Sequence, residues 1–324
     1  MLRPFTHLAW IVAFAFVAAN AAAQERDYPN RPIRMVVGFS AGGTTDFMAR
    51  LLADKLRVPL GQIVIVENKT GANGAIGAEY VAKSEPDGYT LYFTTAGVAV
   101  VYPHLRPTPY NTLRDFTPVS LVAFNSTMLV VNAGMPVKSA VDLAAMARVN
   151  PGKITLAITA LGSVSHLGLM LYQAAADVQF QQVPYRGAAP AMTDLLGGML
   201  NGLFGDGPTV IAHVRAGSIR ALAATSKRRS DIFPDVPTFV EQGFADTIAD
   251  QWAGVLAPAR TPPEAIGKLN AAIAVALNDA GVRAKLRETG TTPAPGPADE
   301  FGLYLRDEYA RWGRIIREKN IKAE

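Results

Sequence analysis

The segment that could do chemistry most directly is G-F-S-A-G at 38–42, which satisfies the pattern G-x-S-x-G. In serine hydrolases this pattern places a nucleophilic serine on a sharp turn between a strand and a helix. An apolar run at 33–39 and a helix-periodic run at 44–56 flank the segment here. Ser40 is therefore a candidate nucleophile, and an exported serine esterase is one hypothesis for the function.

Catalysis by Ser40 would also need a later acid and a histidine. After residue 23 the only histidines are His104, His166 and His213, and none lies in a distinctive motif. The serine pattern also follows the first predicted strand, whereas the hydrolase turn comes well into the sheet. A loop that binds without reacting is the favoured interpretation.

The binding interpretation accounts for more residues of this segment than the nucleophile interpretation does. Gly42 and Gly43 let the backbone approach a ligand closely. Thr44 or Thr45 is expected to cap the next helix, whose free N–H groups attract a carboxylate or a phosphate. Asp46 falls in the first helical turn, where a carboxylate is stabilising even without a ligand. The loop matches neither nucleotide-binding glycine motif, so no nucleotide is expected.

A second segment, T-A-L-G-S-V-S-H-L at 159–167, repeats the order of strand, glycine and helix. Ser163 and Ser165 are the expected helix caps. His166 is more often a packed or capping histidine than a ligand contact. Two helix N-termini that face one cleft would suit a ligand with a carboxylate at one or both ends.

Further candidate residues lie on the loops around these two. Tyr185 and Arg186 follow a predicted strand, and Arg186 either pairs with a carboxylate or is solvated. Asp206 either accepts from an ammonium or hydroxyl group of the ligand, or caps the helix that begins near Pro208. Thr95 follows the third predicted strand and is expected to line the site.

Composition excludes several other classes of protein. Hydrophobic residues make up 49% of the 324 residues and charged residues 18%, which indicates a large core. The net charge of +4 is spread along the chain, so nucleic acid is not an expected partner. The basic run at 227–229 is interpreted as a solvated loop. The chain has no cysteine and its histidines are scattered, so neither a metal site nor a cofactor is expected.

The N-terminal residues are typical of an export signal. Arg3 precedes an apolar run at 8–19, and an A-x-A cleavage pattern occupies 21–23. We expect cleavage near Ala23 and an exported mature protein; an uncleaved anchor is the alternative.

The remaining sequence alternates strands and helices, which is typical of α/β folds. An extended run at 119–131 and an apolar run at 252–257 interrupt the alternation, and we expect the chain to cross between two lobes there. The predicted segments are a signal peptide at 1–23, one lobe at 24–122 plus 251–324, and a second lobe at 123–250. The strands expected in these lobes lie at 33–39, 63–66, 91–94, 154–158, 178–183, 203–204 and 219–224.

Several longer stretches together resemble the TctC/Bug family of solute-binding proteins of tripartite tricarboxylate transport systems. They read YPNRPIRMVVGFSAGGTTD, VENKTGANGAIGAEYVAKSEPDGYTL, VPYRGAAPAMTDLLGG, GSIRALAATSKRRSDIFPDVPTFVEQG and WAGVLAPARTPPEAIGKLN. The resemblance covers about 28–319. It implies an α/β, two-lobed type II periplasmic binding protein (Venus flytrap), with a mixed, mostly parallel sheet in each lobe.

The same resemblance implies a non-enzymatic protein that binds a small organic carboxylate and delivers it to membrane permease subunits, with a monomer as the simplest state. A sensory protein that binds the same ligand and reports to a membrane partner is the alternative. The ligand loops map to 40–46 and 159–166. The expected ligand-binding residues are Ser40, Ala41, Gly42, Gly43, Thr44, Asp46, Thr95, Gly162, Ser163, His166, Tyr185, Arg186 and Asp206.

Overall fold

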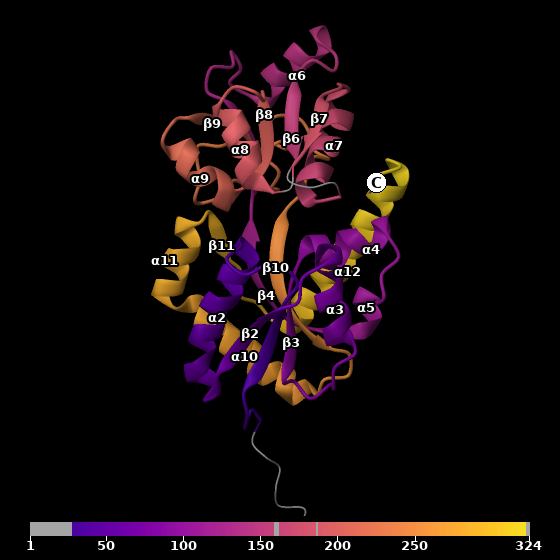
Figure 1. The fold of residues 1–324 in the computed structure, drawn as a ribbon, viewed down its shortest axis with the longest axis vertical. Coiled ribbons are helices and arrows are strands. Elements are labelled where there is room, and N and C mark those ends of the chain that lie inside the picture. Colours follow the sequence, from indigo (N-terminus) through magenta and orange to yellow (C-terminus); the bar gives the residue numbers. More distant parts are fainter. Residues whose placement is uncertain (1–27, 159–161, 186, 322–324) are drawn as a thin grey trace, which may run out of the picture.

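The computed structural model describes residues 28–158, 162–185 and 187–321. The expected signal peptide at 1–23, the start of the second loop at 159–161 and Arg186 lie outside the described residues. Figure 1 shows two lobes, one above the other, joined by extended chain segments. Each lobe has its own sheet flanked by helices, and this confirms the predicted two-lobed α/β fold.

The first lobe is built on a six-stranded mixed sheet. The strands β1, β2, β3 and β4 run in one direction, and β10 and β11 run in the other. From edge to edge the order is β11 (Thr291–Pro293), β4 (Phe116–Asn125), β10 (Gln251–Pro258), β3 (Thr90–Thr95), β1 (Ile33–Val37) and β2 (Val64–Asn68).

Helices cover both faces of this sheet because consecutive residues of its strands are apolar and point to opposite faces. Met35 and Val37 pack with α2 (Thr44–Leu60), α10 (Pro263–Asn278) and α11 (Ala280–Glu288). Val36 points the other way, toward α3 (Ala75–Ala82), the π-helix η2 (Gly97–Val101) and α12 (Ala298–Glu318). Three short helical segments complete this lobe: η1 (Ala72–Gly74), α4 (Tyr102–Leu105) and α5 (Thr112–Asp115).

The second lobe repeats this three-layer design around five strands. Only β5 runs against the other four. The order is β7 (Gln181–Pro184), β6 (Thr155–Ile158), β8 (Gly202–Asp206), β5 (Thr127–Asn132) and β9 (Ile219–Ala224). One face packs on α6 (Ala140–Val149) and α7 (Val164–Ala176), and the other packs on α8 (Ala188–Leu196) and α9 (Gly207–Arg215).

The chain passes between the lobes at two places. Ser126 alone separates β4 of the first sheet from β5 of the second, and residues 225–250 connect β9 to β10. Both crossings were expected from the extended runs. The lobe limits at 122/123 and 250/251 stay a prediction, and β4 continues in the six-stranded sheet to Asn125.

The lobes also touch away from the crossings. At one side, the backbones of Gly207 in α9 and Gly290 before β11 meet closely. A Cβ atom on Gly207 would lie 2.7 Å from the Gly290 carbonyl oxygen. At another side, Leu167 and Leu171 of α7 share a hydrophobic cluster with Trp312 of α12. In this arrangement packing contacts hold the lobes together, in addition to the connecting strands.

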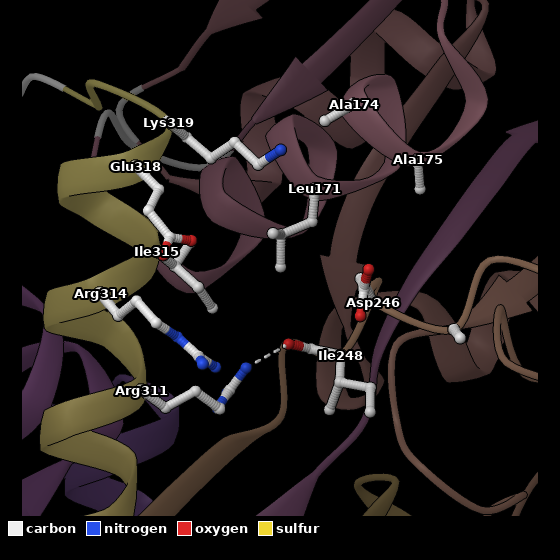
Figure 2. A pocket seen from close by; sticks show the side chains of 11 residues that line it. Leu171, Ala174, Ala175, Asp246, Ile248, Arg311, Arg314, Ile315, Glu318 and Lys319 are labelled. Atoms are coloured by element: carbon white, nitrogen blue, oxygen red, sulfur yellow. Dashed lines mark hydrogen bonds between the residues drawn. The ribbon is translucent and has the colours of Figure 1, made fainter.

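Helix α12 carries a polar contact to the second crossing (Figure 2). The Arg311 guanidinium donates to the Ile248 carbonyl oxygen over 3.0 Å and pairs with Glu308 at 2.6 Å. Beside this contact a groove of about 430 Å³ separates the last turns of α12 from α7, with Arg314 and Lys319 on the α12 side. Within the described residues no helix is long and apolar enough to cross a membrane.

Candidate functional site

The strand directions bring the two predicted loops to the junction of the lobes. Strand β4 leads into β5, so its carboxyl end lies at the junction; β1 and β3 run in the same direction as β4 and end there too. In the second sheet β5 begins at the junction, so its antiparallel neighbour β8, and β6 parallel to β8, end there. The loop after β1 and the loop after β6 therefore leave their sheets at the two edges that face each other across the lobe junction.

The first loop turns through a glycine in the left-handed region. Gly42 has φ of +82°, and Gly43 is the N-cap of α2 without any side-chain cap. The prediction that Thr44 or Thr45 caps this helix is wrong, because both lie inside it. The Gly42 N–H donates instead to Asp46 Oδ2 over 2.9 Å.

Asp46 organises this loop from underneath. Its side chain is only 3% exposed, and it accepts from Arg50 Nε at 2.9 Å and from Asn68 Nδ2 at 2.8 Å as well as from Gly42. Asn68 also donates to the Phe39 carbonyl oxygen. Burial alone would raise the pKa of Asp46, but the hydrogen bonds from Arg50, Gly42 and Asn68 outweigh it and lower the pKa to about 2. The carboxylate is thus ionised, and it holds the loop.

The second loop uses the same positions. Gly162 has φ of +71°, and Ser163 is the N-cap of α7, with its Oγ accepting from the His166 N–H at 3.3 Å. Ser163 is therefore confirmed as a cap. Ser165 lies within the helix, where its hydroxyl contacts that of Ser163 at 2.8 Å, so the prediction of Ser165 as a cap is wrong.

His166 supports this loop from the third helical position. Its Nδ1 accepts from the Gly162 N–H at 3.0 Å, and its Nε2 lies 3.1 Å from Gln182 Oε1 on β7. An Nδ1 that accepts from an N–H carries no proton, so Nε2 carries it and donates to Gln182. The ring is 5% exposed, and this burial lowers the pKa of His166, opposed by the Gln182 hydrogen bond. The imidazole is neutral at neutral pH.

The other predicted residues differ in exposure and in whether another side chain already binds them. Ser40 and Ala41 are exposed on the first loop, and Thr95 is buried at the end of β3. The Tyr185 hydroxyl donates to Asp194 over 2.5 Å, so that side chain is tied to α8.

Asp206 is the N-cap of α9 by position, but its side chain makes no cap hydrogen bond. Its carbonyl oxygen and its Oδ1 both accept from the Thr209 hydroxyl, at 2.8 and 3.3 Å. Burial raises the pKa of the Asp206 carboxyl above its usual value. The carboxyl group thus stands at the end of β8, at the lobe junction.

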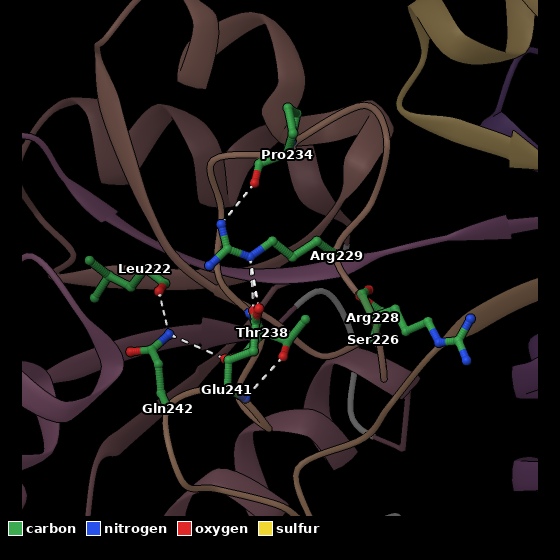
Figure 3. A network of polar contacts seen from close by, with 8 residues as sticks. All are labelled: Leu222, Ser226, Arg228, Arg229, Pro234, Thr238, Glu241 and Gln242. Carbon is green, nitrogen blue, oxygen red and sulfur yellow. Dashed lines mark hydrogen bonds and ion pairs between the residues drawn. The ribbon is translucent and has the colours of Figure 1, made fainter.

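The basic run at 227–229 is only partly a solvated loop (Figure 3). Arg228 is exposed and points away from the neighbouring polar contacts. Arg229 instead binds both carboxylate oxygens of Glu241 at 3.0 Å and donates to the Pro234 carbonyl oxygen. Glu241 in turn accepts from the Thr238 N–H. This network fixes the segment between β9 and β10.

The arrangement around Ser40 is not that of a nucleophile. No hydrogen bond joins Ser40 to any of the three histidine rings among the described residues. The described residues also contain no cluster of histidine, aspartate and glutamate that could hold a metal ion. What the loops offer is backbone N–H groups at two helix N-termini.

The carboxamides that support these loops were not predicted from the sequence. Asn68 ends β2 and Gln182 lies in β7, and these are edge strands next to β1 and β6. For Asn68 the available signal was a polar residue at the end of a strand, whereas Gln182, the second residue of β7, offered no such signal. Arg50, one turn after Asp46, was visible as an i,i+4 ion pair.

Known proteins share this sequence and fold over nearly all of the chain. The family model described as the tripartite tricarboxylate transporter family receptor, TctC, matches residues 48–321. Protein BugT of Bordetella pertussis is 39% identical over 324 residues, and the match covers 99% of each chain.

Solved structures agree with this assignment. A Rhodopseudomonas palustris protein solved with adipate is 35% identical, with a TM-score of 0.80, and the match covers 91% of this chain and 99% of that one. MatC from Rhodopseudomonas palustris, solved with bound malate, is 29% identical with a TM-score of 0.76, covering 89% and 100%. These relatives are binding proteins and not enzymes, which overturns the esterase hypothesis for Ser40. The chain belongs to the TctC receptor family of tripartite tricarboxylate transporters, a family of periplasmic solute-binding proteins.

Proposed function

We propose that the protein captures a small dicarboxylate between its lobes and presents it to membrane permease subunits. The observation that carries the proposal is the pair of glycine loops, each at the N-terminus of a helix, on facing edges of the two sheets. Each helix N-terminus favours one carboxylate through its free N–H groups and its dipole. A ligand with a carboxylate at each end would bridge both lobes.

Relatives solved with adipate and with malate support this ligand class, because both are dicarboxylates. We propose Ser40, Ala41, Gly42, Gly43 and Thr44 as the contacts in the first lobe. Those in the second lobe are Gly162, Ser163, Tyr185, Arg186 and Asp206, with Thr95 at the side. Asp46 and His166 act by holding the loops.

Capture requires that the ligand bind the closed arrangement of the lobes better than the open one, since equal affinity would shift nothing. We further propose that residues 1–23 are an export signal cleaved near Ala23, and that the mature protein is a periplasmic monomer. Delivery to a permease, rather than reporting to a sensor, is the role that matches the family.

The test is a thermal melt of ligand-free mature protein with adipate, malate and tricarboxylates. A ligand at a hundred times its dissociation constant stabilises a protein by about 2.7 kcal/mol, which raises the melting temperature measurably. The matched control is adipamide, which has the length of adipate without its charges. A saturable shift with adipate or malate and none with adipamide is expected. Equal shifts with both, or none with any acid, would reject the proposal.

A further inference from the structure

One buried ring connects the described end of the second loop to the edge of the sheet. The Gly162 N–H donates to His166 Nδ1, and His166 Nε2 donates to Gln182 Oε1. The ring thus joins an edge strand to the left-handed glycine of the loop. If a proton were added to Nδ1, an N–H would face the Gly162 N–H, and this hydrogen bond could not persist.

The described surroundings of the His166 ring do not stabilise a positive charge on it. Among the described residues no charged side chain acts on His166, and its polar partner beyond the helix is the neutral Gln182. The ring is 5% exposed, so water does not solvate an added charge well. It also lies in the first turn of α7, where the helix dipole disfavours a cation.

We propose that His166 and Gln182 are positioning residues of the ligand site: the neutral imidazole holds Gly162, just before α7, in the arrangement that binds the carboxylate. The inference rests on the proposed function and adds its regulation. Protonation of His166 releases Gly162, so ligand is held at neutral pH and lost in acid. Gln182 selects the tautomer, because its oxygen accepts from Nε2.

The tautomer can be observed without any ligand. After cleavage near Ala23 the chain keeps His104, His166 and His213, so nitrogen-15 spectra of the imidazoles contain three sets of signals. The sets of His104 and His166 are both expected to show the Nε2–H tautomer, because His104 Nε2 also faces a carbonyl oxygen. The His166 set is the one that vanishes in His166→Asn, and it should resist protonation longer than an exposed histidine. An Nδ1–H tautomer for His166, or titration as in a free peptide, would overturn the inference.

Binding then tests the consequence. Dissociation constants for adipate and malate are measured by calorimetry from pH 7.5 to 5, for wild type and for His166→Asn. The amide oxygen of the introduced asparagine can still accept near the Nδ1 position, but the side chain does not titrate. Below the pKa of His166, the wild-type constant is expected to rise about tenfold per pH unit relative to that of His166→Asn. Titration of the ligand carboxyls affects both proteins alike and cancels in the ratio.

Two further variants separate positioning from simple packing. Gln182→Glu places a carboxylate against Nε2, which favours the protonated ring, so the loss of binding should begin at a higher pH. His213→Asn on α9 is the matched control and should behave as wild type. An identical pH profile in wild type, His166→Asn and Gln182→Glu would refute the inference. If wild type binds neither acid at any pH, the proposed ligand class fails, and the spectra still decide the role of His166.

Discussion

Asp46 and His166 occupy the same position in the two lobes. Each is the third residue of the helix that follows the loop, and each accepts a hydrogen bond from the N–H of the glycine four residues earlier. Gly42 and Gly162 both have φ in the left-handed region. One backbone design therefore serves both halves of the site, although the two side chains differ in chemistry.

The supports behind these side chains match as well. Asn68 on edge strand β2 donates to Asp46, and Gln182 on edge strand β7 accepts from His166. The difference is charge, since Asp46 is ionised and paired with Arg50, whereas the imidazole is neutral. The first lobe should therefore hold its loop over a wide pH range, and the second should not.

Replacing Asp46 by Asn tests the first support. The amide keeps the size of the side chain but turns one acceptor into a donor. At the Oδ1 position this donor faces Asn68 Nδ2, and at the Oδ2 position it faces both the Gly42 N–H and Arg50. We expect a loss of about 1–3 kcal/mol of unfolding free energy, with weaker binding of adipate and malate. Denaturant unfolding and calorimetry measure the two effects. Asp54→Asn, on the exposed face of the same helix, is the control and should change neither.

Asp46 also makes the free energy of unfolding depend on pH. Its pKa is lowered from 3.8 to about 2 in the folded chain. A depressed pKa stabilises the folded state above the unfolded pKa, and this stabilisation is lost as the pH falls from about 4 toward 2. The difference in stability between wild type and Asp46→Asn should shrink over that interval. A constant difference from pH 7 to 2 would contradict this assignment.

Much of the fold was predictable because hydrophobic periodicity marks buried strands and amphipathic helices. The strand at 219–224 was predicted with the limits that the structure has, and the strand at 154–158 within one residue. Two features could not be predicted from this periodicity. Strand β11 has three residues, too few to show a period. Helix α2 continues through Pro59, because a proline next to the helix end is exposed and removes only one intrahelical hydrogen bond.

The site was less predictable than the fold. Glycine loops at helix starts can be recognised along the chain, and so can a cap such as Ser163. Which side chain supports a loop depends on residues that only the sheet order brings together, as Asn68 comes beside Asp46 across 22 positions. The choice of Thr44 as a cap failed for a related reason. Asp46, held by Arg50 and Asn68, already accepts from the Gly42 N–H, and Gly43 begins the helix without a side chain.

Gly207 should tolerate no larger residue. In Gly207→Ala the new Cβ would lie 2.7 Å from the Gly290 carbonyl oxygen, so the lobes must separate or the backbone must shift. We expect a loss of about 1–3 kcal/mol and, in small-angle scattering, a larger radius of gyration.

The control for this substitution is Gly267→Ala in α10, where a Cβ would meet nothing within 4 Å. Alanine has the higher helix propensity, so this variant should gain roughly 0.5–1 kcal/mol. A Gly207→Ala protein as stable and as compact as wild type would show that the glycine contact does not set the lobe position.

Arg311 should be the side chain that ties α12 to the second crossing. In Arg311→Met, Glu308 would stay buried without its counter-charge, and Ile248 would lose its donor. Loss of one partner of a buried pair costs about 3–5 kcal/mol, and the lower end applies because Arg311 is 24% exposed. Trp312, which donates to Glu308, should report the change in its fluorescence. Arg314→Met, on the exposed side of the same helix, is the control.

Ionisation of Asp250 should lower the free energy of unfolding as the pH rises toward 7. It precedes β10 in the second crossing, where burial, followed by the charge of Glu308, raises its pKa from 3.8 to about 7 against the opposing charge of Arg311. With a raised pKa the folded state binds the extra proton, so stability is greatest below about pH 4 for this group and declines up to about pH 7. Other groups add their own trends, so the variant difference isolates the residue.

In Asp250→Asn this decline is absent, so the stability of the variant relative to wild type should increase as the pH rises from 5 to 8. Thermal melts of both proteins at each pH measure the difference, which should level off above the pKa of Asp250. Asp246→Asn, four residues earlier and exposed, should follow wild type throughout. A difference between Asp250→Asn and wild type that does not change with pH would mean that the Asp250 carboxyl titrates as an ordinary surface acid, despite its burial and the nearby charge of Glu308.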